Sequence, residues 1–183
     1  MMKLRIFITV LLLLSPLPAL SAEAHINGVV VGKNPELNVS FIVRNAFTEK
    51  IEEALQSGVA TSFRFIIELN RTRRGWFDPD VGRWEFRHTV RYDTLRKEYE
   101  ITLDERGGET IRTRDVFEMK EIMSRVDRIA LKPVWQLEKG RGYSLRIMAE
   151  LKTIRLPFLL DYALFFIRFF DVETGWYTHY FTF

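Results

Sequence analysis

The chain has 183 residues, of which 47% are hydrophobic and 28% are charged, and it contains no cysteine. A chain without cysteine has neither a disulfide framework nor a thiolate site. Its 27 basic and 24 acidic residues give a formal net charge of +3, and without Lys3 and Arg5 of the N-terminal segment the balance is 25 − 24 = +1. Nucleic-acid binding requires a strongly basic face, so we expect no nucleic-acid partner.

Residues 1–22 have the pattern of a secretory signal peptide, because basic residues precede an apolar run at 6–14. That run has nine residues, whereas a transmembrane helix needs about 20, so a retained anchor is the weaker alternative. Cleavage after Ala22 or after Ala24 fits the small-residue rule, and no cysteine is present for lipid attachment. We therefore predict an exported, periplasmic protein in which 23–183 form a single β-rich domain.

Two strands and a helix are predicted first. Residues 26–31 and 37–43 have strand composition and are separated by turn-forming residues. A helical period follows and places on one face Phe47, Ile51, Ala54 and Leu55. Asn45 is the expected N-cap of this helix, and Gly58 is expected to end it in the left-handed conformation.

The clearest alternation of apolar and polar residues lies between Gly58 and Asp104 and predicts three consecutive antiparallel strands. The predicted inward side chains include Phe63, Phe65, Ile67, Leu69, Trp84, Phe86, His88, Val90, Tyr92, Tyr99, Ile101 and Leu103. We expect a four-residue loop around 93–96 between the second and third strands. If the apolar side chains of the second and third strands share one face, Val90 pairs with Tyr99, His88 with Ile101 and Phe86 with Leu103.

The second half of the chain predicts a helix and further strands. Asp115 and Glu118 suggest a capping box at the start of a helix whose apolar stripe is Val116, Met119, Ile122, Met123 and Val126. Strands are predicted over 129–137, with Pro133 at an edge or bulge, and over 143–151. The predicted fold class is α+β and β-rich: a mainly antiparallel bent sheet or sandwich of about seven to nine strands with two or three helices.

Residues 157–170 are apolar nearly throughout, yet this stretch is too short to span a bilayer. It could cover one end of the sheet, line a pocket for an apolar ligand, or insert into a membrane interface. The candidate residues for ligand or membrane contact are Phe158, Tyr162, Phe165, Phe166, Phe169 and Trp176.

Catalytic motifs of hydrolases, metalloproteases and nucleotide-binding loops are missing from the sequence. His88 falls on an apolar strand face, which is typical of a core histidine, and a metal site that it shares with His179 is the weaker alternative. Asp78 and Asp80 are more typical of a solvated loop than of a cation site. We therefore predict no catalytic residue, no metal and no cofactor, with a carboxylate-dependent hydrolase as a distant alternative.

Arginines at the end of one predicted strand and along the next are the clearest interaction feature. Arginine binds phosphate and carboxylate groups bidentately, so pairing of these strands would form an anion-binding face, unless Glu68, Glu85, Glu98 and Glu100 neutralise it. The candidate partner-binding residues are Arg71, Arg73, Arg74, Arg83, Arg87 and Arg91.

The chain resembles the exported bacterial proteins grouped as domain of unknown function 4390. The resemblance rests on the order of short motifs: Arg44-Asn45-Ala46-Phe47, 51–59, Glu68-Leu69, Arg73, Trp76-Phe77, 88–99, 149–151, Leu156-Pro157-Phe158 and Trp176-Tyr177. It implies no reaction, ligand or catalytic residue. Genes of this family often lie beside a membrane sensor kinase of the nitrogen-regulation type, which makes such a kinase a candidate partner.

Besides the carboxylate-dependent hydrolase, these observations lead to one functional hypothesis and one further alternative to it. The hypothesis is a non-catalytic exported domain that acts in the envelope by binding, with another protein as its partner. The alternative is a carrier, or a peripheral membrane-surface protein, for an apolar ligand.

Overall fold

The computed structural model describes residues 23–33, 36–72, 80–132, 137–153 and 172–183. The described residues form two antiparallel sheets, one of seven strands and one of three, together with two α-helices. The β-rich, mainly antiparallel fold class predicted from the sequence is thus confirmed.

The larger sheet has the strand order β10-β8-β3-β4-β5-β6, and β9 also pairs with β8. Its strands are β3 (Thr61–Arg71), β4 (Asp80–Asp93), β5 (Glu98–Leu103), β6 (Glu109–Thr113), β8 (Gly142–Thr153), β9 (Val172–Glu173) and β10 (Tyr177–Thr182). The smaller sheet has the order β1-β2-β7 and consists of β1 (His25–Gly32), β2 (Asn38–Arg44) and β7 (Arg125–Ala130).

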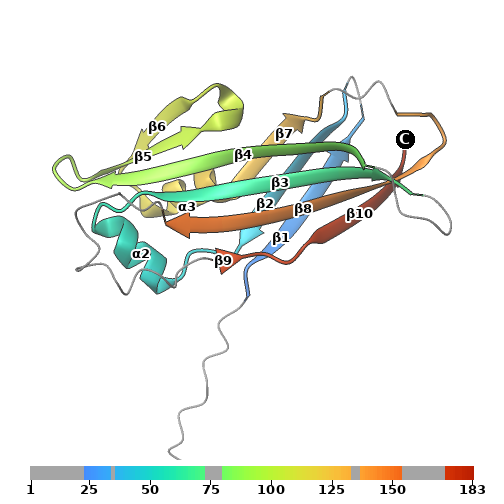
Figure 1. Cartoon of the computed structure of the whole chain (residues 1–183). Coiled ribbons are helices and arrows are strands. Elements are labelled where there is room, and N and C mark those ends of the chain that lie inside the picture. Colours follow the sequence, from blue (N-terminus) through green and yellow to red (C-terminus); the bar gives the residue numbers. More distant parts are fainter. Residues whose placement is uncertain (1–22, 34–35, 73–79, 133–136, 154–171) are drawn as a thin grey trace, which may run out of the picture.

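Two layers of strands enclose the core, and the helices lie at one end of them. In Figure 1 the smaller sheet crosses behind β3, β4 and β8, and the same view places α2 (Glu49–Gln56) and α3 (Val116–Ser124) together at one end. A short 3₁₀ turn, η1 (Asp104–Arg106), follows β5. An ion pair between Lys120 Nζ and a carboxylate oxygen of Glu52, at 2.6 Å, joins the two helices.

The core forms between the apolar faces that the alternation predicts. Phe63 is 1% exposed, Phe86 is 8% exposed and Ile101 is fully buried. The ring of Phe41 in β2 lies 5.7 Å from that of Phe65 in β3, centroid to centroid. Because these rings belong to different sheets, the two sheets share one hydrophobic core.

Helix α2 begins after Thr48, so the prediction of Asn45 as its N-cap is wrong. The hydroxyl oxygen of Thr48 accepts the N–H of Ile51 at 3.4 Å. Asn45 instead has a φ of 58° and turns the chain away from the end of β2. Asparagine tolerates this left-handed conformation better than most residues because its short polar side chain bonds locally. Gly58 ends the helix as predicted, with a φ of 86°.

The predicted register between β4 and β5 is wrong by two residues. The last paired residue of β4 is Asp93, opposite Glu98, and its Oδ1 accepts the N–H groups of Leu95 and Arg96 at 2.9 and 3.0 Å. The loop therefore has the predicted four residues but spans 94–97. An even shift leaves every side chain on its predicted face. The observed pairs are His88 with Leu103, Val90 with Ile101, Arg91 with Glu100 and Tyr92 with Tyr99.

Asp115 caps α3 as predicted, because its Oδ1 accepts the N–H of Phe117 at 2.8 Å. The capping box is not completed, since the carboxylate of Glu118 accepts a hydrogen bond from the hydroxyl of Thr113 instead. Val126 lies in β7 rather than on the helix. The strand predicted over 129–137 corresponds to β7, which begins earlier and ends at Ala130, while Pro133 lies outside the described residues.

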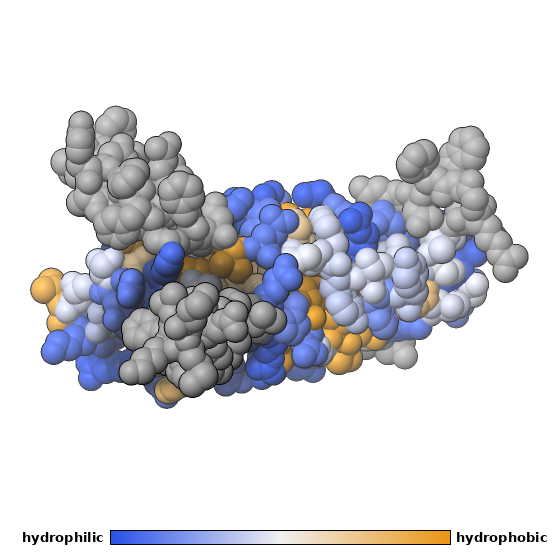
Figure 2. All heavy atoms as spheres, turned by 90° about the horizontal axis from the view of Figure 1, so that it is seen from below, coloured by the Kyte–Doolittle hydropathy of each residue, from blue (hydrophilic) through white to orange (hydrophobic). Residues whose placement is uncertain are grey.

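The face seen in Figure 2 carries both polar and apolar side chains of the described residues. Figure 2 shows a face on which polar side chains surround smaller apolar patches. The large hydrophobic side chains that are exposed in the described part of the chain are Val30, Leu95, Phe117, Trp176 and Tyr180. Two of them, Phe117 and Trp176, line hollows in the surface.

Candidate functional site

The arginines singled out from the sequence are paired with carboxylates wherever the structure describes them. The distances between a guanidinium nitrogen and a carboxylate oxygen are 2.6 Å for Arg71–Glu138, 2.7 Å for Arg83–Glu68, 3.9 Å for Arg87–Glu85 and 3.1 Å for Arg91–Glu100. Arg73 and Arg74 lie outside the described residues. Three of the four glutamates that could neutralise this face, Glu68, Glu85 and Glu100, therefore pair with its arginines. Anion binding at this face stays a prediction.

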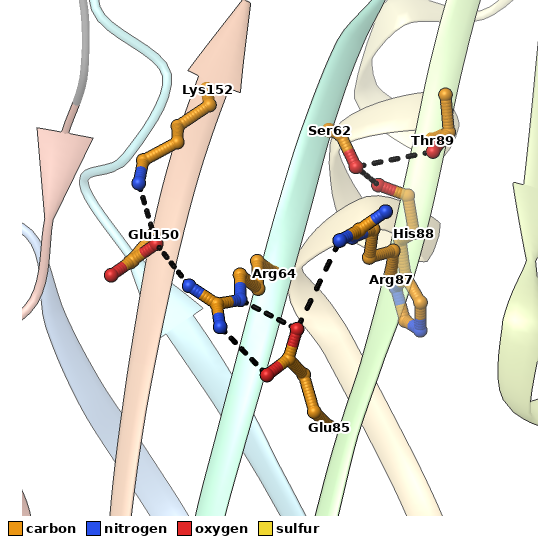
Figure 3. A network of polar contacts seen from close by, with 8 residues as sticks. All are labelled: Ser62, Arg64, Glu85, Arg87, His88, Thr89, Glu150 and Lys152. Atoms are coloured by element: carbon orange, nitrogen blue, oxygen red, sulfur yellow. Dashed lines mark hydrogen bonds and ion pairs between the residues drawn. The ribbon is translucent and has the colours of Figure 1, made fainter.

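Arg64, which the sequence pattern did not single out, is the centre of this polar face. Its Nε and Nη2 donate to the two carboxylate oxygens of Glu85, each at 2.7 Å, and its Nη1 lies 3.4 Å from Glu150. Figure 3 shows how this network joins β8, β3 and β4, with Lys152 on the far side of Glu150. The hydrogen bond from Arg64 holds the pKa of Glu85 below its ordinary value. Exposed ion pairs contribute little stability individually, so this network mainly fixes the side chains.

His88 is a core histidine, as its strand position suggested. Only 1% of it is exposed, its Nδ1 lies 3.1 Å from the carbonyl oxygen of Met123, and its Nε2 lies 3.0 Å from Oε1 of Glu105. A backbone carbonyl only accepts hydrogen bonds, so Nδ1 donates, and a proton must lie between Nε2 and the Glu105 carboxylate. Both ring nitrogens are therefore engaged, and neither has a free lone pair for a metal ion or a substrate proton.

The other candidates from the sequence are separated or lie outside the described residues. His179 is on β10, which β8 and β3 separate from the strand of His88. In the described ranges, no group of three or more metal-ligating side chains comes together. Asp78 lies outside those ranges, and Asp80 begins β4 opposite Asn70. The aromatic candidates that lie outside them are Phe158, Tyr162, Phe165, Phe166 and Phe169.

A hollow of about 570 Å³ opens where β2 ends beside α3 and the start of β7. We call it the basic hollow, and its lining includes Ile42, Arg44, Phe47, Phe117, Lys120 and Arg125. Arg125 pairs with Glu121 at 2.8 Å, and Lys120 pairs with Glu52. Arg44 is exposed and has no carboxylate partner among the described residues. Phe117 is 77% exposed, so an apolar ring and a cation without a carboxylate partner among the described residues line one hollow.

A second hollow, of about 520 Å³, lies beside the start of β1. We call it the aromatic hollow, and its lining includes Glu23, His25, Asn45, Gly175, Trp176 and Tyr177. Trp176 is 38% exposed. The guanidinium carbon of Arg146 lies 4.3 Å from the centroid of its ring. This distance is typical of a cation–π contact, which holds the indole in place.

The two hollows meet at Asn45, which lines both. His25 lies opposite Arg44, and Ile42 lies opposite Arg125, so the start of β1, the end of β2 and the start of β7 form one end of the smaller sheet. No periodicity in the sequence predicts this site, because its residues come from four separate segments.

No helix in the described part of the chain has both the length and the apolar character that a membrane crossing requires. Searches for similar curated proteins and for similar solved structures returned no match. A family model described as a domain of unknown function, DUF4390, matches residues 26–179. The matched range runs from β1 into β10 and includes the Arg44–Phe47 turn. The chain therefore belongs to the DUF4390 family, as the order of its motifs suggested.

Proposed function

We propose that this chain is an exported, non-catalytic domain of the bacterial envelope that acts by binding another protein at the basic hollow. The observation that carries the proposal is that one hollow is lined by the exposed ring of Phe117 and by the guanidinium of Arg44, which has no carboxylate partner among the described residues. Aromatic and arginine side chains are the residues that dominate binding energy at protein interfaces. The family resemblance makes a membrane sensor kinase of the envelope the first partner to test.

Export is part of this proposal, and the burial of residue 24 supports cleavage after Ala22 rather than after Ala24. Ala24 is 5% exposed and belongs to the core, and the carbonyl of Glu23 accepts a hydrogen bond from His25 Nδ1 at 2.9 Å. Cleavage after Ala24 would remove both contacts. We expect intact-mass measurement of the periplasmic protein to give a chain that begins at Glu23. A chain that begins at His25 would contradict this choice, and a full-length chain in the membrane fraction would favour the retained anchor.

Partner binding is tested by placing the photo-crosslinker benzoylphenylalanine at Phe117 in the full chain in living cells. We expect one reproducible cross-linked protein, because this ring is 77% exposed at the rim of the hollow. The matched control is the same group at Leu95, which is 94% exposed in the loop after β4. Failure to obtain a product at Phe117, or equal labelling at both positions, would overturn the proposal.

The alternative function, contact with an apolar ligand or a membrane surface, is favoured by one observation about the C-terminal aromatic segment. Leu151 of β8 lies opposite Val172 of β9, so the strands that precede and follow the apolar segment 154–171 in the sequence pair with each other. Flotation with phospholipid vesicles and native mass spectrometry distinguish the two functions. Co-flotation of the mature chain, or a co-purified lipid, supports the alternative, and neither result is expected if the domain acts only on a protein partner.

A further inference from the structure

We infer that the partner presents an acidic segment that lies across both hollows, with a carboxylate on Arg44 and apolar side chains against Phe117 and Trp176. This inference rests on the proposed function and adds to it the chemistry of the partner and the position of a second contact. Three observations lead to it: the continuity of the surface, the distribution of paired charges, and the placement of the two exposed rings.

The surface is continuous because one short turn separates the hollows. Asn45 lines both of them. Asn45 follows the last residue of β2, the middle strand of the smaller sheet. The strands on either side of β2, which are β1 and β7, line different hollows. His25 of β1 lines the aromatic hollow, and Arg125 of β7 lines the basic hollow. A segment that crosses the end of this sheet would therefore contact all three strands.

The charge of the partner follows from which cations are already paired. Lys120 and Arg125 have carboxylate partners within the domain, Glu52 at 2.6 Å and Glu121 at 2.8 Å. Arg44 has none among the described residues and is exposed in the lining of the basic hollow, next to Asn45, which lines both hollows. A guanidinium binds a carboxylate through two parallel hydrogen bonds. An aspartate or glutamate of the partner would therefore find its counter-charge at Arg44.

Each hollow contributes one exposed aromatic ring as an apolar contact. Phe117 is 77% exposed at the basic hollow, and Trp176 is 38% exposed at the aromatic hollow. Arg146 stacks on Trp176, with 4.3 Å between the guanidinium carbon and the ring centroid, and so orders the ring before a partner binds. Ordered aromatic side chains lose little conformational entropy on binding, which increases affinity. An acidic residue flanked by apolar residues is the sequence that matches this arrangement.

The test compares cross-linking from both hollows in the full chain in living cells. Benzoylphenylalanine at Phe117 and, in a second variant, at Trp176 is expected to capture the same protein. Mass spectrometry of the cross-linked peptides is expected to identify one partner segment that contains aspartate or glutamate. Arg44→Glu in each background is expected to lower the yield by about tenfold, the effect of losing a contact of about 1.4 kcal/mol.

The matched control for the charge reversal is Lys139→Glu. Lys139 is also exposed and has no ion pair among the described residues, but it lies beside the start of β8, away from both hollows. Its reversal is expected to leave the yield unchanged, and circular dichroism of each purified variant checks that it folds. Equal yields from the two charge reversals would overturn the inference, as would a captured segment without acidic residues.

The same experiment separates this inference from the proposed function. A product at Phe117 that is absent at Trp176, or that is insensitive to Arg44→Glu, would overturn the inference and leave a partner at the basic hollow. Absence of any product at Phe117 would overturn the proposed function itself.

Discussion

Replacing Phe65 by alanine is expected to lower the free energy of unfolding by about 3–5 kcal/mol, the usual cost of truncating a fully buried phenylalanine. Phe65 has no exposed surface. Its ring centroid lies 5.1 to 5.7 Å from those of three other rings, Phe41, Phe63 and Phe86. Because Phe41 belongs to the smaller sheet, the alanine variant leaves a cavity between the two sheets. Urea unfolding, followed by circular dichroism, measures the loss as a lower midpoint.

Two comparisons make this result specific to the shared core. Leu95→Ala removes a large side chain that is 94% exposed, and it is expected to change stability by less than about 0.5 kcal/mol. Phe65→Leu keeps most of the volume and is expected to cost less than the alanine variant. A loss below about 1 kcal/mol for Phe65→Ala, the average for any substitution, would show that the two sheets do not share a core.

Replacing His88 by alanine is expected to cost a similar amount, about 3–5 kcal/mol, because it leaves the largely buried carboxylate of Glu105 without its hydrogen-bond partner. The variant leaves Oε1 of Glu105 and the carbonyl oxygen of Met123 without the hydrogen bonds that His88 now makes. Oε2 of Glu105 is already buried without a partner in the described structure. His88 also packs against Phe65, with 4.8 Å between ring centroids, so packing is lost together with the hydrogen bonds.

The pH dependence of stability tests the pair separately from packing. Burial by itself would raise the pKa of Glu105, but the hydrogen bond from His88 and its charge outweigh burial and hold this pKa below the ordinary value. A carboxyl group with a lowered pKa in the folded state stabilises the fold above its unfolded pKa of about 4.3. That stabilisation is lost as the pH falls through the folded pKa. We therefore expect the stability difference between the wild type and His88→Ala to shrink as the solution is acidified below about pH 4.

His88→Gln provides a control in case the alanine variant does not fold. The glutamine amide donates hydrogen bonds and so can satisfy Glu105 without carrying a charge. Its stability difference from the wild type is expected to be smaller than that of alanine and also to shrink in acid. A difference that is independent of pH in both variants would mean that the pair carries no net interaction.

The strands and the core could be predicted because each apolar face is local in the sequence. The alternation through Phe63, Phe86 and Ile101 identifies the buried side of three neighbouring strands whatever their pairing. The register of β4 and β5 could not be predicted in the same way, since an even shift preserves every face. The side-chain bonds of Asp93 in the turn place the loop at 94–97, and hydrophobic pattern carries no information about them.

The edge strand β6 and the first helix cap were missed for related reasons. β6 (Glu109–Thr113) has a single apolar residue, Ile111, so its alternation is too weak to detect. Asn45 has the composition of an N-cap but occupies a left-handed turn, and Thr48 caps the helix three residues later. Propensity alone does not distinguish these two uses of a short polar residue, because both satisfy the local backbone.

By itself the amino-acid sequence determined the family, the β-rich class and the inward face of each long strand, because these depend on local composition and on a period of two. Only the tertiary structure decided which charges are paired among the described residues. It pairs Arg83 and Arg91 with glutamates of neighbouring strands and leaves Arg44 exposed in the hollow that Phe117 also lines. Ion pairing and the formation of a hollow depend on distances between residues far apart in the chain, and those distances exist only after the two sheets have packed.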